Sequence, residues 1–148
     1  MRFIPSDFIK KLVLIIFLSM PISSFALIKL NVETLMKNYI DEGLILSTEF
    51  NSSKILEEGM LSEFYLGEKL KFDLVVNFEN DTLNSGPSDL ISVKGTLTYF
   101  SSFKQFKFDL GPRKFRLGQK ESFFIQLEKG KKLEIYLKSE IKGFYGAN

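Results

Sequence analysis

Few residue types are available for chemistry, because the 148-residue sequence contains no Cys, no His and no Trp. This composition excludes disulfides, thiolate and imidazole metal sites, and catalysis that uses a Cys nucleophile or a His base. General acid or base chemistry would fall to Asp, Glu, Lys or Tyr. No acidic residue stands alone in an apolar segment that would perturb its pKa. We therefore expect a protein that is not an enzyme and needs no cofactor or metal.

Two groups of polar side chains are candidates for binding. The tightest basic cluster is a candidate anion-binding site and consists of Arg113, Lys114, Arg116 and Lys120. Asn80 and Asp81 lie in a long polar loop at residues 79–89, and surface loops on a rigid sheet often carry binding residues. Each candidate has a structural alternative. Acidic residues of a neighbouring strand could neutralise the cluster, and the loop could be only a connection.

The N-terminal segment has the three parts of a secretory signal peptide. Basic residues precede an unbroken apolar run at 12–18, and Ser24-Phe25-Ala26 places small residues at positions −3 and −1 of a cleavage site. We predict cleavage after Ala26, which divides the chain into a signal peptide at 1–26 and one periplasmic or secreted domain at 27–148. The alternative is an uncleaved anchor, although its apolar stretch would be short and interrupted by a Pro and three Ser.

Removing residues 1–26 changes the charge of the chain from +2 to zero, with 17 basic and 17 acidic residues left. A basic field that would attract nucleic acid is therefore not expected. The charges are unevenly distributed along the chain, since residues 41–81 carry a net charge of −7 and residues 82–148 carry a net charge of +6.

The first element of the predicted domain has a helical pattern. Apolar residues recur at i, i+3, i+4, i+7 and i+8 from Val32, Asn31 stands at the N-cap position, and Gly43 stands at the C-cap position. We predict a short amphipathic helix at residues 31–42. A helix this short would need to dock its apolar face on the rest of the chain.

The remainder of the chain alternates with a period of two, which predicts strands that are buried on one face and solvated on the other. A run at 44–50 is followed by a polar Asn-Ser-Ser and a short run at 55–56, and Gly130 lies in a tight turn between the last two strands. Twelve Phe residues after residue 26 predict a core rich in phenylalanine rings, with an apolar cavity as the alternative. The clearest strands are Lys69–Phe78, Ile91–Phe100, Phe106–Leu110, Phe123–Leu127 and Leu133–Lys142.

Two segments resemble immunoglobulin-like domains of periplasmic pilus chaperones. FKFDLGPRKFRLGQKESFFI at 106–125 is similar to a family segment that runs from a Pro through Arg-Leu and a turn into an alternating strand. LKFDLVVNFEN at 70–80 is similar to a family strand that ends in an Asn-containing turn. The resemblance implies an immunoglobulin-like sandwich. Chaperone activity does not follow, since that family has two domains and a basic pair that has no assigned counterpart in this chain.

Taken together, the sequence predicts an all-β protein: a single antiparallel β-sandwich, immunoglobulin-like, with one short N-terminal helix. We expect an exported non-catalytic module that binds another envelope or extracellular protein through an edge strand or the loop at 79–89. Nucleic acid is not an expected partner. The alternative is a carrier of a hydrophobic ligand such as a lipid, in which the helix at 31–42 caps a half-barrel.

Overall fold

The structure is a computed structural model that describes residues 25–80 and 89–145. Most of the predicted signal peptide lies outside these residues. Its last two residues, Phe25 and Ala26, are the first two of a strand, and the side chain of Ala26 is buried. Cleavage after Ala26 would therefore remove two residues from one end of that strand.

Nine antiparallel strands form two sheets, and the described residues contain no helix. The first sheet has the order β2-β1-β9-β8, and the second has the order β3-β4-β5-β6, with β7 also paired to β5. Their bounds are β1 Phe25–Ile40, β2 Gly43–Glu57, β3 Ser62–Leu66, β4 Leu70–Phe78, β5 Leu90–Phe100, β6 Gln105–Asp109, β7 Arg113–Arg116, β8 Lys120–Glu128 and β9 Lys131–Tyr145.

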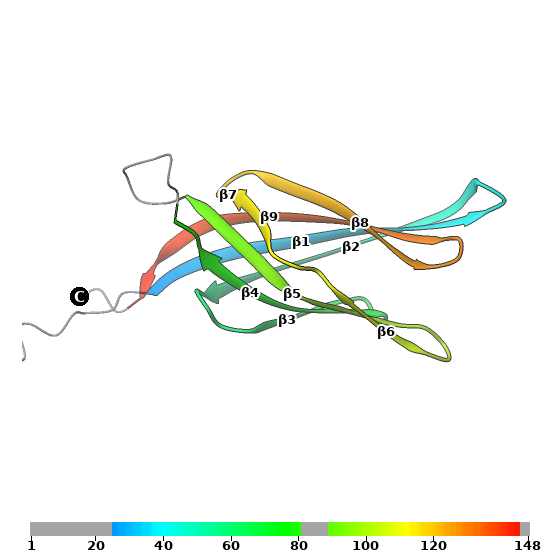
Figure 1. Ribbon diagram of the computed structural model, residues 1–148, viewed down its shortest axis with the longest axis horizontal. Coiled ribbons are helices and arrows are strands. Elements are labelled where there is room, and N and C mark those ends of the chain that lie inside the picture. The colour runs from blue at the N-terminus through cyan, green and yellow to red at the C-terminus, as the bar shows by residue number, and fades with distance from the viewer. Residues whose placement is uncertain (1–24, 81–88, 146–148) are drawn as a thin grey trace, which may run out of the picture.

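The two sheets pack face to face as a sandwich and differ in length. The hairpin turns β1–β2, β8–β9 and β5–β6 all lie at one end of the molecule, on the right of Figure 1, and we call this the distal end. The start of β1 and the end of β9 lie at the other end. The first sheet reaches farther at the distal end, because β1, β2 and β9 have 15 or 16 residues whereas no strand of the second sheet exceeds 11.

The predicted antiparallel sandwich is thus present, with a simple strand order. Within both sheets, neighbouring strands follow one another along the chain, except where β1 pairs with β9 and β7 with β5. An immunoglobulin domain instead interleaves its strands between two sheets in a Greek key. The observed order differs from that arrangement.

The prediction of a helix at 31–42 is wrong, because residues up to Ile40 belong to β1. The helical spacing coincided with a second pattern of period two, in which Ile28, Leu30 and Val32 point into the core and are fully buried. β1 is bonded along its length to β2 on one side and to β9 on the other. Pairing and burial of this kind override a local helical preference.

The other strand predictions agree with the structure to within a few residues. β4, β5, β6, β8 and β9 are present, and Gly130 occupies the turn between the last two with a φ of 73°. The short polar segment at 51–53 does not interrupt β2, which runs through it. Two short strands were not predicted, β3 and β7, although Phe64 and Leu66 of β3 do alternate with exposed residues.

The core between the sheets is mainly aliphatic. Only three phenylalanines are among its buried residues, namely Phe64, Phe72 and Phe115, and several others are half-buried at its margin. Eight of the described phenylalanines thus contribute to the core, three as buried residues and five as half-buried residues packed against it. Leucine, isoleucine and valine side chains of β1, β4, β5 and β9 fill the centre.

The β1–β2 turn is conformationally strained. Asp41 and Glu42 both have positive φ angles, 49° and 66°. Such values match a two-residue hairpin turn in which Asn-Gly is the favoured pair. Residues other than Gly, Asn or Asp pay a steric cost in this region of φ.

Replacing Asp41-Glu42 with Asn-Gly should therefore stabilise the protein. We expect the free energy of unfolding to rise by about 1 kcal/mol, measured by urea denaturation. Gly130→Ala is a control that should lower the free energy of unfolding. Gly130 has a positive φ, and an added Cβ would lie 2.6 Å from the Tyr39 carbonyl oxygen. An Asn-Gly variant no more stable than the wild type would show that this turn is not strained.

Candidate functional site

The predicted basic cluster is divided between the two sheets, and three of its members are paired with carboxylates. Arg113, Lys114 and Arg116 lie on β7, and Lys120 begins β8. The ion pairs are Lys114 with Glu79 at 3.1 Å, Lys120 with Glu33 at 2.6 Å, and Arg116 with Asp89. These contacts favour neutralisation between strands over an anion-binding role for these three residues.

Arg113 differs from the rest of the cluster. Its guanidinium lies over the ring of Phe123, with its central carbon 4.3 Å from the ring centroid. Its buried Nε atom has no hydrogen-bond partner. Arg113 thus bridges the two sheets by a cation–π contact rather than by an ion pair.

The predicted loop site is only partly described. Asn80 is exposed just after β4, and Asp81 lies outside the described residues. Glu79, at the start of the loop, is engaged with Lys114. The described part of the loop is thus tied to β7 through Glu79.

Strand β2 is the longest edge of the sandwich. It has 15 residues, contains no Pro, and keeps a continuous register with β1 from Leu46 to Glu57. The other edges are interrupted or short. β3 has five residues, β6 and β7 are separated around Gly111, and β8 has a register shift before Glu128. Proteins normally protect free strand edges by such means, and β2 lacks most of them.

Exposed apolar side chains are frequent in β2, β3 and the turn between them. Eleven large hydrophobic residues are exposed among those described, and six of them lie between Gly43 and Leu66. We call these six the β2–β3 edge. They are Leu44, Leu46, Ile55, Met60, Leu61 and Tyr65. They lie along the whole length of β2 and on β3, and Leu44 and Leu46 point to opposite faces of the sheet.

The two strands of this edge are tied together by charged side chains. Lys54 Nζ on β2 donates a hydrogen bond to the carbonyl oxygen of Glu63 on β3 and lies 5.5 Å from the centroid of the Phe64 ring. Glu63 also accepts from Lys71 at 2.7 Å. The hydrogen bond from Lys71 lowers the pKa of the Glu63 carboxyl, and the reciprocal bond raises the pKa of Lys71. Residues 43–66 carry four acidic residues and one basic residue, a net charge of −3.

Sequence reasoning missed the β2–β3 edge as a site. The available signal was the net charge of −7 over 41–81, combined with apolar residues that do not follow the alternation, such as Met60-Leu61. The alternation rule assigns apolar residues to the core, so these were not recognised as surface residues.

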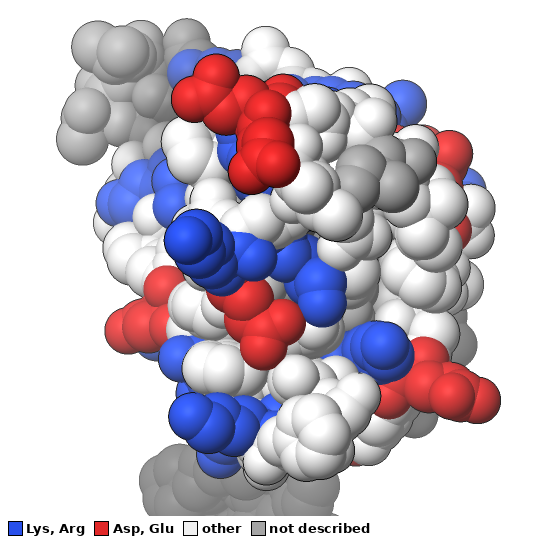
Figure 2. Space-filling model, turned by 90° about the vertical axis from the view of Figure 1, so that its right-hand side faces the viewer, with Lys and Arg blue, Asp and Glu red and all other residues white. Residues whose placement is uncertain are grey.

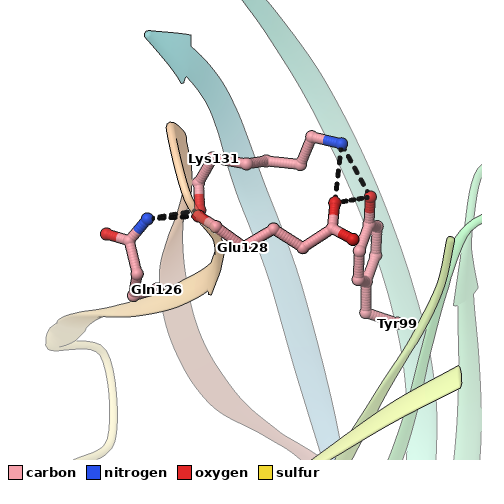
Figure 3. A network of polar contacts seen from close by, with 4 residues as sticks. All are labelled: Tyr99, Gln126, Glu128 and Lys131. Carbon is pink, nitrogen blue, oxygen red and sulfur yellow. Dashed lines mark hydrogen bonds and ion pairs between the residues drawn. The ribbon is translucent and has the colours of Figure 1, made fainter. Parts of the chain in front are cut away.

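A network of interacting polar side chains lies near the distal end, between the sheets (Figure 3). Lys131 Nζ donates to the Tyr99 hydroxyl at 2.8 Å and pairs with Glu128 at 3.2 Å. The Tyr99 hydroxyl donates to Glu128 at 3.3 Å, and the side chain of Tyr99 is buried. The bond to Tyr99 raises the pKa of Lys131, and the bond from Lys131 lowers that of Glu128.

No model of a known protein family matches this chain, and neither does any curated protein or solved structure in the comparisons. Within residues 25–80 and 89–145, no group of three or more acidic side chains is placed to hold a metal ion. No helix in this part of the chain is long and apolar enough to cross a membrane.

The Glu128–Lys131 pair should give the protein an acid-dependent component of stability. Because the folded-state pKa of Glu128 lies below its ordinary value, the pair stabilises the fold above that value, and the contribution is lost as the pH falls through the folded-state pKa. We expect Glu128→Gln to reduce the loss of stability between pH 5 and pH 3 in urea denaturation. The matched control is Glu49→Gln, at an exposed position on β2. Equal acid dependence in Glu128→Gln and the wild type would contradict the pairing.

Proposed function

We propose that this protein is an exported, non-catalytic binding module that accepts an extended segment of another protein along the free edge of β2. The observation that carries this proposal is the edge itself: β2 is 15 residues long, keeps one register with β1 from Leu46 to Glu57, and pairs with no other strand among the described residues. Each exposed N–H and C=O group on such an edge can pair with an added strand. The predicted signal peptide supports a partner in the envelope or outside the cell.

The side chains along the edge indicate which side chains the partner segment should carry. The side chains of Ile55 and Tyr65 are 62% and 60% exposed, and both lie beside acidic residues of the same edge. A suitable segment would carry apolar side chains to cover them and basic side chains opposite Glu49 and Glu57. Charge complementarity of this kind selects the partner and sets the register more than it adds affinity.

Binding rather than catalysis is also the function that the side chains support best. The most perturbed charged groups, such as Lys71 and Glu63, are already saturated by hydrogen bonds to one another. Catalytic groups are normally perturbed in a cleft where a substrate can reach them. The immunoglobulin-like subclass is not needed for this proposal, since any antiparallel sandwich with a free edge can accept a strand.

Site-specific photo-crosslinking tests the proposed edge. A photoreactive phenylalanine analogue at Ile55 should form an adduct with a partner in the native envelope. The same analogue at Phe124 is the matched control, because Phe124 is 65% exposed and lies on β8, the opposite edge of the same sheet. Equal adduct yields at the two positions, or none at Ile55, would refute binding along β2.

A charge substitution gives an independent readout. Ile55→Lys should weaken recovery of the complex by roughly tenfold, which corresponds to about 1.4 kcal/mol, because it removes apolar contact and brings a positive charge toward a basic segment. Phe124→Lys should leave recovery unchanged. Circular dichroism of both variants controls for folding.

A further inference from the structure

The inner face of the longer sheet is left uncovered at the distal end. Leu46 pairs with Asn38 and Thr48 pairs with Met36, so that these β2 residues share the face that carries the core residues of β1. Met36 is still buried, but Leu46 is 57% exposed although it faces the interior side. The core therefore opens to solvent where the shorter sheet stops.

This opening is a cavity of about 420 Å³ between the two sheets, which we call the distal mouth. Its volume lies within the range of about 300–1,000 Å³ that small-molecule sites occupy. Nine residues line it, from β1, β2, the β3–β4 turn and the start of β9. They are Met36, Asn38, Leu46, Thr48, Phe50, Gly67, Glu68, Lys69 and Lys131.

The apolar wall of the distal mouth is formed by side chains that fit closely around a glycine. The ring of Phe50 lies against Gly67, where an added Cβ would come within 2.6 Å of the ring. Gly67 also has a φ of 63°, which other residues rarely adopt. The glycine thus lets the β3–β4 turn close over Phe50 and shape one side of the cavity.

Two lysines stand at the rim of this apolar cavity. Lys131 is fixed by Tyr99 and Glu128, and its raised pKa keeps it cationic. Lys69 is exposed, and within the described part of the chain its ammonium forms no ion pair. Glu68 is the only acidic residue in the lining. Figure 2 looks onto this end, where basic and acidic side chains both stand beside uncharged surface.

We infer that the distal mouth binds a single-chain amphiphile with an anionic head group, such as a fatty acid. The alkyl chain lies against Met36, Leu46 and Phe50, and the head group is held by Lys69, because Lys131 is already paired with Glu128. An apolar wall with cations at its opening matches the two ends of such a molecule. This site differs from the edge of β2, which accepts a strand through its backbone, and from the helix-capped half-barrel expected from the sequence.

The chain provides a closely matched pair of positions for the test. Leu44 and Leu46 are 56% and 57% exposed and stand two residues apart on β2. The register shift between them pairs Leu44 with Tyr39 and Leu46 with Asn38, which are adjacent on β1 and therefore point to opposite faces. Leu46→Asp would place a carboxylate in the distal mouth, and Leu44→Asp would place one outside it.

The test is isothermal titration calorimetry with dodecanoate below its micelle concentration. We expect saturable binding to the wild type, at least about tenfold weaker binding to Leu46→Asp and to Lys69→Gln, and unchanged binding to Leu44→Asp. Dodecanol tests the role of the head group, and acetate tests the role of the chain. Both should bind more weakly than dodecanoate.

Several outcomes would overturn the assignment. These are no binding of dodecanoate to the wild type, equal weakening by the two leucine substitutions, or equal affinity for dodecanol and dodecanoate. A wild-type dimer that Leu46→Asp converts to a monomer would show instead that a second copy covers the opening. Ile55→Lys should still bind dodecanoate, so that failure of the edge proposal and failure of this one can be told apart.

Discussion

The backbone pairing of β1 is the interaction on which the rest of the structure depends. Fourteen residue pairs join β1 to β2, and fourteen join it to β9. The first and last strands of the domain are therefore neighbours at the centre of one sheet. β1 has no free edge and its inner residues are buried, so that it fixes the positions of β2 and β9. β9 in turn fixes the position of β8, with which it forms a hairpin.

A sheet organised in this way must end in two free edges. β8 is the shorter of them, and its register shifts near its end. β2 is longer, keeps one register from Leu46 to Glu57, and carries exposed apolar residues, and free edges of this kind favour pairing with another chain. The recognition of another chain proposed above would cover this edge.

The sequence predicted the class of fold well and the surface poorly. Alternation located β4, β5 and β9, because buried and solvated faces repeat with a period of two. It failed for β1, where Leu35 and Tyr39 on the outer face completed a helical spacing by chance. Only the pairing with β2 and β9 decides between the two patterns, and the pairing with β9 joins residues as far apart in the chain as Phe25 and Tyr145.

The candidate sites could not be predicted for a related reason. The basic cluster was visible as a run of charges, but its partners Glu33 and Glu79 lie far away in the sequence and come close only through the sheets. The exposure of Leu46 likewise depends on where a neighbouring strand stops. A local pattern can show that a residue is apolar, but it cannot show that the strand which should cover it is missing.

The unequal lengths of the two sheets explain where the distal mouth lies. An added residue pair in the β1–β2 hairpin stabilises the sandwich only if the second sheet covers it. Beyond Met36 this cover ends, and Leu46 and Ile40 remain exposed. The strained turn at Asp41-Glu42 lies at the tip of this same extension. An extension that buries little and contains strain contributes weakly to folding, and it is here that we place the distal mouth.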